Sequence, residues 1–418
     1  MPWYDHRNGE LFAEAVRLAD IAERYGTPTF VYSASAIRNA YREFAKACAG
    51  RRVTICYALK ANSNLAVVDL LAREGAGFDI VSAGELRRVL AVGGDPARVV
   101  FSGVGKSAAE MREALEAGVG CFNVESDSEL ERLSEVAQAL GRRAAVSLRV
   151  NPDVDARTHP YISTGLRQNK FGIAHGRARA TYRRAAGLPG IDVVGIDCHI
   201  GSQITEIAPF LAAADRVADL VDELRADGIE LRHIDLGGGL GVRYRDEDPP
   251  SRQALMQAIF ERLDSRFEAG RYEIMFEFGR ALVGNAGLLL TRVEYIKDTG
   301  ERRFAIVDAA MNDLIRPSLY DAWHGVVPVR PRAGATLPHD IVGPVCESGD
   351  WLARERMLCV EPGDLLAFES AGAYAMVMSS NYNSRGRAAE VMVDGDRAQL
   401  VRERESLESL YALERTLK

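Results

Sequence analysis

The sequence predicts an α/β protein built on a (β/α)8 TIM-like barrel, joined to a C-terminal antiparallel β-domain. Two observations predict the barrel. Short apolar runs alternate with amphipathic helical patterns from residue 50 to 280, and polar residues follow almost every apolar run. A third observation, the change to short β-rich runs after residue 287, predicts the β-domain. With 418 residues, the chain is long enough for two domains.

The apolar runs give the expected strands of the barrel. They lie at 53–58, 78–81, 98–102, 120–124, 145–150, 193–199, 232–236 and 273–277. Helical patterns lie between them at 64–74, 84–93, 107–118, 126–140, 209–227 and 253–270, and several begin after Ser or Asn and end at Gly. A doubly wound sheet would show the same alternation, so this count alone leaves that fold open.

Polar residues at the strand exits favour the barrel. A pure scaffold would not need them, and the carboxyl ends of barrel strands form the face on which barrel enzymes keep their catalytic residues. The exits carry Lys60, Asp79, Ser102, Asn123, Arg149, His199, Asp235 and Glu277. In the second domain, β-rich runs separated by turns lie at 288–293, 304–308, 364–368 and 389–393.

Composition excludes several classes of protein. The net charge of -7 and the absence of a basic block argue against nucleic-acid binding. The six cysteines show no CxxC spacing, so we expect neither a disulfide framework nor a metal site. The start of the chain lacks the apolar core of a signal peptide, and no run is long enough to span a membrane. We therefore expect a cytoplasmic enzyme with reduced thiols.

Lys60 is the first candidate for chemistry. It follows the apolar run Val53–Ala58, so a long amine stands at the exit of a buried strand. Partial burial lowers the pKa of an amine and makes its neutral, nucleophilic form available for a Schiff base. The alternative is a surface lysine whose stem packs along the strand end.

Consecutive glycines at Gly237, Gly238 and Gly239 predict a phosphate site. They permit positive φ and let backbone N–H groups approach an anion, and barrels often bind phosphate with the loops after strands seven and eight. Gly279 and Arg280 follow the neighbouring strand and support this interpretation. The alternatives are a sharp turn without ligand and an Arg280 that pairs with a structural carboxylate.

His199 and Glu277 suit a flat cofactor ring at the barrel mouth. An imidazole from strand six could stack on the ring, and a carboxylate from strand eight could keep a ring nitrogen protonated, as an electron-sink pyridine requires. The alternatives are a histidine of the core or rim, and a buried ion pair between Glu277 and a barrel arginine.

Five motifs together resemble a known family over nearly the whole chain, the fold-type III, alanine racemase-like pyridoxal phosphate decarboxylases. The motifs are Tyr57–Asn62, His199–Gln203, Gly237–Gly239, Glu277–Arg280 and Cys346–Asp350. The resemblance implies that pyridoxal 5'-phosphate is bonded to Lys60, that His199 stacks on its ring and that Glu277 pairs with the ring nitrogen. It further implies that the cofactor is bound by Asp79, Ser202, Gly237, Gly238, Gly239, Gly279, Arg280 and Tyr374.

The resemblance also implies a substrate and a partner. The expected reaction is decarboxylation of meso-2,6-diaminopimelate to L-lysine, with Arg280, Arg316, Tyr320, Glu347 and Tyr374 at the substrate. Cys346 is the expected proton donor, and Glu347 faces the distal ammonium. Both enter the active site of the other subunit, so we expect an obligate homodimer. Domain boundaries follow at 34–286 for the barrel, and at 1–33 with 287–418 for the β-domain.

Two alternatives stay open, and one departure from the family pattern is visible. A decarboxylase of the same fold acting on ornithine, lysine, arginine or carboxynorspermidine would share the cofactor residues. A cofactor-binding barrel without decarboxylase activity would keep Lys60 but would not need Cys346. Alanine racemase does not fit the motifs at His199 and Cys346. The family usually has proline where this chain has Phe278, which restores an N–H and adds bulk near the phosphate turn.

Overall fold

The computed structural model describes residues 3–155 and 169–417. The chain divides into two compact units. The barrel unit contains Ala40–Val242 and Asp248–Leu282, and the β unit contains Met1–Asn39, Arg243–Glu247 and Val283–Lys418. Among the described residues, no helix is long and apolar enough to cross a membrane.

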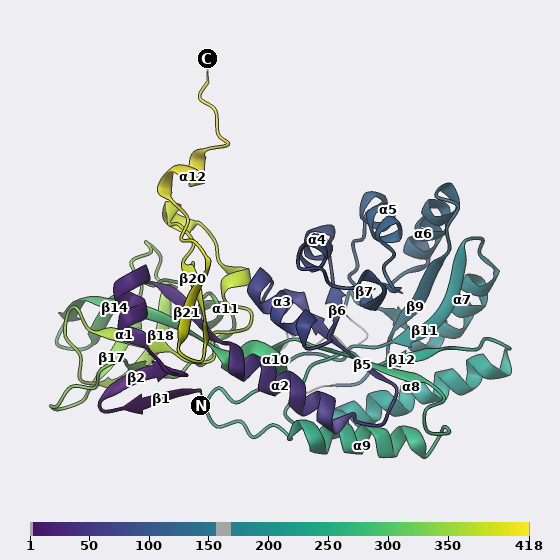
Figure 1. Ribbon diagram of the computed structural model, residues 1–418, viewed down its shortest axis with the longest axis horizontal. Helices are drawn as coiled ribbons and strands as arrows, with labels where there is room; N and C mark the ends of the chain where they lie inside the picture. The colour runs from purple at the N-terminus through teal and green to yellow at the C-terminus, as the bar shows by residue number, and fades with distance from the viewer. Residues whose placement is uncertain (1–2, 156–168, 418) are drawn as a thin grey trace. The chain divides into compact units, whose positions relative to one another are not determined.

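The barrel unit contains a closed ring of eight parallel strands (Figure 1). They are β5 (Val53–Ala58), β6 (Gly77–Ile80), β7 (Val99–Phe101), β8 (Cys121–Val124), β9 (Ala144–Asn151), β11 (Ile191–Asp197), β12 (His233–Asp235) and β13 (Glu273–Phe278). The ring closes because β13 pairs with β5, with Glu277 opposite Cys56. A doubly wound sheet has open edges, so the closure confirms the barrel. Every strand boundary lies within two residues of the sequence prediction.

Helices surround this ring (Figure 1). They are α2 (Ala34–Ala47), α3 (Leu65–Arg73), α4 (Ala83–Ala91), α5 (Ala108–Ala117), α6 (Asp127–Ala139), α7 (His175–Gly187), α8 (Ala208–Ala226) and α9 (Arg252–Asp264). Side chains of Asn64, Ser82, Ser107, Ser126 and Ser251 cap the N-termini of α3, α4, α5, α6 and α9. The sequence did not predict α7, which lacks a side-chain cap and is rich in arginine. Two-residue β10 (Ile173–Ala174) pairs with β9.

The β unit contains a mixed sheet in the order β18-β17-β15-β14-β4-β20-β21, with β16 and β19 paired beside it. Its strands are β4 (Thr29–Ser33), β14 (Gly287–Asp298), β15 (Arg303–Val307), β16 (Val326–Pro328), β17 (Leu337–Val342), β18 (Trp351–Leu358), β19 (Leu365–Phe368), β20 (Ala389–Asp394) and β21 (Arg397–Arg402). Most pairs are antiparallel, as expected, but β15–β17 and β4–β20 are parallel. As the resemblance implied, the N-terminal strand β4 lies within this sheet.

Shorter elements complete the β unit. A three-stranded sheet contains β1 (Tyr4–Arg7), β2 (Glu10–Ala13) and β3 (Val16–Arg17), and the helices are α1 (Leu18–Tyr25), α11 (Arg316–Tyr320) and α12 (Leu407–Tyr411). One apolar core joins β1, β2 and α1 to β4, β14, β19 and β20. Helix α10 (Arg280–Val283) lies at the boundary of the two units.

Phe278 packs on the outer side of the barrel strands. Its ring stacks on Phe44 of α2 with centroids 4.1 Å apart, and on Phe276 at 5.4 Å. Successive side chains of a strand point to opposite faces, so Glu277, between these two phenylalanines, points into the barrel. The bulk of Phe278 therefore fills the layer between β13 and α2, and is directed away from the barrel interior.

Candidate active site

Lys60 and Asp79 form an ion pair at the exits of the neighbouring strands β5 and β6. The Lys60 Nζ lies 2.5 Å from the Asp79 Oδ2. The lysine side chain is 34% exposed, whereas the aspartate side chain is fully buried. Oδ1 of Asp79 is buried without a hydrogen-bond partner among the described residues. The amine is thus held by a buried carboxylate and remains accessible to a ligand.

Glu277 points into the barrel from β13 and is 5% exposed. Its Oε1 accepts hydrogen bonds from Asn123 Nδ2 at 3.1 Å and from Ser102 Oγ at 3.3 Å. Both donors come from the ends of β7 and β8, across the barrel. These neutral donors orient the carboxylate without neutralising its charge, and they replace the arginine partner considered as the alternative.

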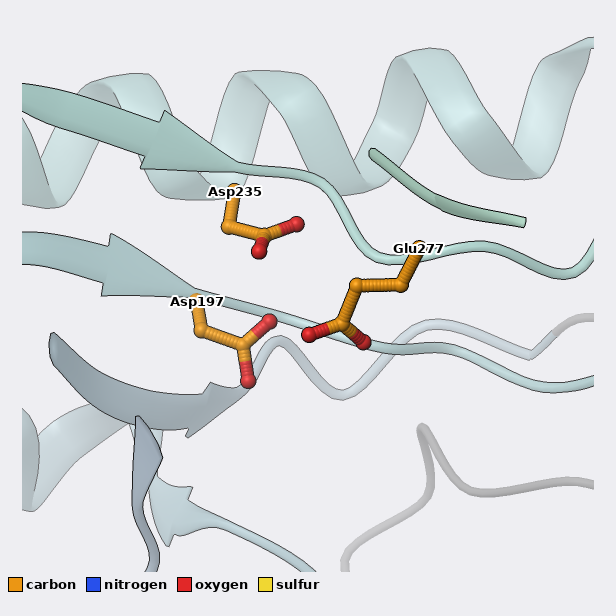
Figure 2. A group of neighbouring side chains, drawn as sticks. All are labelled: Asp197, Asp235 and Glu277. Carbon is orange, nitrogen blue, oxygen red and sulfur yellow. The ribbon is translucent and has the colours of Figure 1, made fainter. Parts of the chain in front are cut away.

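Three buried carboxylates meet beside this site, from Asp197, Asp235 and Glu277 (Figure 2). Each offers an oxygen, and these oxygens lie within 4.8 Å of one another. Burial and the neighbouring acids raise the pKa of Asp197 and of Glu277 well above their ordinary values. Burial raises the pKa of Asp235 to about 7. These shifts favour the protonated form of the carboxyl groups unless a cation joins them.

A metal ion is a poor occupant for this group. Hard cations such as Ca²⁺ and Mg²⁺ take about six or more oxygen ligands, commonly including water. Asp197, Asp235 and Glu277 supply one such atom each, and all three are buried.

Arg149, at the end of β9, is the buried cation nearest to these acids. Its Nη1 lies 3.1 Å from Glu125 Oε1, and its Nε lies 3.9 Å from Asp197 Oδ2. Burial lowers the pKa of this guanidinium, but the surrounding carboxylates outweigh that effect and raise it. Around the barrel mouth the buried acids outnumber the cations Lys60 and Arg149, so protons or a further cation must compensate the remaining acids.

The glycine turn after β12 lies against the next strand exits. Gly237 has φ +66°, and a Cβ at Gly238 would lie 2.0 Å from the carbonyl oxygen of Glu277. The Gly238 N–H donates to Nδ1 of His199 at 3.2 Å, which places the ring proton of a neutral imidazole on Nε2. Burial and the cations Arg149 and Lys60 lower the pKa of His199, so the neutral form is favoured.

Arg280 follows Gly279 at the exit of β13, and its side chain contacts Ser202. Its Nη2 and Nε donate to Ser202 Oγ at 3.2 and 3.4 Å. Gly279 is needed at this exit, because a Cβ there would lie 2.9 Å from the Ala61 Cβ. A guanidinium, a hydroxyl and a glycine-rich backbone are a donor set suited to an anion such as phosphate.

The other predicted residues belong to the β unit. Arg316 begins α11, is 6% exposed, and donates to the Tyr244 hydroxyl at 3.3 Å. Tyr320 ends the same helix. Tyr374 has φ +55°, a backbone conformation that non-glycine residues rarely adopt. Cys346 is exposed, so it is not the small core residue that a cysteine in a β-domain would ordinarily be.

The structure thus brings together the predicted barrel residues Lys60, Asp79, His199, Ser202, Gly237, Gly238, Gly239, Glu277, Gly279 and Arg280 at one end of the strands. The sequence did not indicate that Asp197 joins Asp235 and Glu277 in one group of buried acids. It also did not indicate the contacts of Arg149 with Glu125 and of Asn123 with Glu277. Strand alternation could have found Asp197, because it ends β11 and lies two residues before His199.

Known proteins resemble this chain over its whole length. A family model described as the pyridoxal binding domain of pyridoxal-dependent decarboxylases matches residues 34–284. A diaminopimelate decarboxylase of Pseudomonas aeruginosa is 61% identical over 417 residues, and one of Vibrio cholerae is 56% identical over 418 residues. Both alignments cover 100% of each chain.

Two solved structures of diaminopimelate decarboxylases are also similar to this chain in fold and sequence. Diaminopimelate decarboxylase from Helicobacter pylori, complexed with L-lysine, is 42% identical with a TM-score of 0.91, and the match covers 95% of this chain and 99% of that one. The enzyme from M. jannaschii, in co-complex with L-lysine, is 38% identical with a TM-score of 0.94, over 99% and 98% of the two chains.

The raised pKa of Asp235 predicts a pH-dependent stability. Its carboxyl stays protonated in the folded protein up to a pKa of about 7, whereas the unfolded chain releases this proton near pH 4. The resulting stabilisation is complete below the unfolded pKa and is lost as pH rises through the folded one. Asp235→Asn removes this titration, so the free energy of unfolding of the cofactor-free variant should fall less between pH 5 and 8, by about 1–3 kcal/mol.

Chemical denaturation at a series of pH values measures this difference. Asp219→Asn is the matched control, because Asp219 has a side chain that is 52% exposed. Its pH profile should follow that of the wild type. The same profile for Asp235→Asn would show that Asp235 holds no proton in the folded protein.

Proposed function

Because the chain belongs to the diaminopimelate decarboxylases of the pyridoxal-dependent decarboxylase family, we propose that the residues at the barrel mouth and in the β unit perform that reaction as follows. The reaction converts meso-2,6-diaminopimelate to L-lysine and CO2 in lysine biosynthesis. Pyridoxal 5'-phosphate is the cofactor.

One observation supports the assignment most strongly: an accessible amine, Lys60, lies at the same barrel mouth as a group of buried acids. A cofactor whose ring nitrogen carries a proton would add one positive charge beside these acids, while a bond at Lys60 would keep the charge that the amine already has. The added charge would compensate the carboxyl groups that burial otherwise favours in their protonated form. The residues present therefore fit this cofactor, in charge as well as in donor type.

We propose these roles for the barrel residues. Lys60 bonds to the cofactor aldehyde, with Asp79 holding the amine, and Glu277 holds the proton at the ring nitrogen. His199 stacks on the ring, while Ser202, the glycines 237–239, Gly279 and Arg280, with Tyr374, bind the phosphate. When bound, the cofactor supplies an electron sink for the pair left by departing CO2.

The β unit, together with Arg280 of the barrel unit, supplies the proposed contacts to the substrate. Arg280, Arg316 and Tyr320 bind the distal carboxylate, since guanidinium groups pair with carboxylates in a bidentate fashion. Glu347 binds the distal ammonium, and the Cys346 thiol gives a proton to the carbon that has lost CO2. Tyr374 contacts both substrate and phosphate.

We further propose that the enzyme is a cytoplasmic homodimer in which Cys346 and Glu347 complete the partner's site. The exposure of Cys346 supports this, because a thiol that serves another subunit must lie on the surface of its own chain. The proposed domain boundaries remain 34–286 for the barrel, and 1–33 with 287–418 for the β-domain.

A simple diamine-forming decarboxylase is the competing function. Ornithine or lysine carries a distal ammonium but no distal carboxylate, so such an enzyme would need no counterpart to Arg316. A guanidinium suits a distal carboxylate, which it can pair with in a bidentate fashion, and diaminopimelate carries such a carboxylate whereas ornithine and lysine do not. The favoured substrate therefore carries a second carboxylate.

Lys60→Ala tests the assignment of the amine. The wild-type protein supplied with pyridoxal 5'-phosphate should release L-lysine and CO2 from meso-diaminopimelate, and should leave ornithine and lysine nearly unused. Borohydride should fix the cofactor to the peptide containing Lys60, as peptide mass mapping would show. Lys60→Ala should lose both the linkage and the activity, by at least about 10³-fold in kcat.

Lys46→Ala, at an exposed lysine of α2, is the control and should keep both. Reduced cofactor on another lysine would refute the role of Lys60. Turnover of ornithine in place of diaminopimelate would refute the substrate.

Subunit mixing tests the shared site. Cys346→Ala and Lys60→Ala dimers should each be nearly inactive. Random exchange of equal amounts makes about half of the dimers mixed, each with one intact site of two, so roughly a quarter of wild-type activity should return. Native mass spectrometry would verify the mixed dimers. An inactive mixture that contains them would place Cys346 outside the partner's site.

A further inference from the structure

The loop Val345–Asp350, which contains Cys346 and Glu347, belongs to no helix or strand. Two tight turns shape it: the Glu347 N–H donates to the Val345 carbonyl at 2.8 Å, and the Asp350 N–H donates to the Glu347 carbonyl at 3.1 Å. Cys346 and Glu347 are both exposed, so packing within their own chain does not fix them. Within this chain, their placement depends on hydrogen bonds to neighbouring segments.

Asp350 fixes the base of this loop. It is 4% exposed, and its carboxylate accepts the Met311 N–H at 2.6 Å and the Val345 N–H at 2.9 Å. Gly343 makes room for it, since a Cβ there would lie 2.4 Å from the Asp350 Oδ2. These contacts hold the ends of the loop but do not reach Cys346.

Asn383 contacts the loop at Cys346 itself. Its Oδ1 accepts the Cys346 N–H at 2.8 Å. Asn383 has φ +56°, in the left-handed region that asparagine tolerates better than most residues. The Glu347 carboxylate raises the pKa of the phenol of Tyr382, the neighbour of Asn383. The short turn Tyr382–Ser384 therefore holds the loop at Cys346 through Asn383.

We propose that Asn383 is a positioning residue for Cys346, and that its side-chain oxygen sets where the thiol delivers its proton. This inference rests on the proposed function. When the bond between the reacting carbon and CO2 breaks, the electron pair is left behind, and the bound cofactor would act as its sink until the carbon takes up a proton. A new C–H bond then forms with the proton of the Cys346 Sγ, and the thiolate recovers a proton from water. A donor held on one side adds that hydrogen to one face of the carbon.

Two substitutions separate the hydrogen bond from the backbone conformation. Asn383→Gly keeps the left-handed conformation, which glycine adopts freely, but removes the acceptor. Asn383→Asp keeps an acceptor on a residue that also tolerates this conformation. Ser384→Gly is the matched control, because Ser384 has φ +54° in the same turn and, among the described residues, its side chain forms no hydrogen bond with the loop.

The first measurement is turnover of meso-diaminopimelate in deuterium oxide. Asn383→Gly should lower kcat about 5- to 10-fold with KM nearly unchanged, as expected for a lost hydrogen bond that acts on proton delivery. NMR of the lysine formed should show deuterium on one face of the new methylene for the wild type, and on both faces for Asn383→Gly. Asn383→Asp and Ser384→Gly should resemble the wild type.

The second measurement needs no turnover. Alkylation by iodoacetamide, followed by peptide mass spectrometry, should be roughly threefold faster at Cys346 in Asn383→Gly than in the wild type, because the loop is less restrained. Cys359, which is partly exposed, is the internal reference and should react at an unchanged rate. Thermal unfolding of each variant verifies that it is folded.

Cys346→Ala separates the proposed role of Cys346 as proton donor from the proposed role of Asn383 as positioning residue. If Cys346→Ala loses activity and single-face delivery while Asn383→Gly keeps wild-type kcat, labelling and alkylation, the positioning role alone is overturned. If Cys346→Ala itself keeps wild-type kcat and single-face delivery, the proposed role of the thiol fails, and the positioning role fails with it.

Discussion

The accumulation of buried carboxylates at the carboxyl ends of the barrel strands is the constraint on which the site depends. Like charges in a medium of low dielectric constant cannot all be ionised, so burial raises their pKa values until protons or cations compensate them. Lys60 and Arg149 compensate only part of this charge. A ligand that brings positive charge is therefore stabilised here. The acids concerned are Asp79, Glu125, Asp197, Asp235 and Glu277.

Barrel geometry explains how residues so distant in sequence meet. Parallel strands in a closed ring bring all their carboxyl ends to one face, and alternation along each strand sends every second side chain inward. Glu277 points inward because Phe278 packs outward on Phe44. Gly238 approaches the Glu277 carbonyl closely, so the glycine turn Gly237–Gly239 lies directly beside the strand that carries Glu277.

Much of this arrangement could be predicted from the sequence. The eight strand positions followed from apolar runs, and Lys60, His199 and Glu277 followed from their exits. The contacts between these side chains could not be predicted in this way. Glu277 accepts a hydrogen bond from Asn123 of β8, and this contact depends on which strands face each other across the ring. Helix α7 was missed because no side-chain cap marks its start, and because its buried face, Ala178, Thr181, Tyr182 and Ala185, consists mostly of small residues among arginines. The turn that holds Cys346 was missed because an exposed asparagine in a loop carries no periodic signal.

The central claim is that the acidic site keeps the ring nitrogen of the cofactor protonated through Glu277. Its most direct test is the 15N chemical shift of the enzyme loaded with ring-15N pyridoxal 5'-phosphate at neutral pH. The account predicts the shift of a protonated pyridinium in the wild type and of a neutral pyridine in Glu277→Gln, with the cofactor still bound in both. A neutral ring nitrogen in the wild type would contradict it.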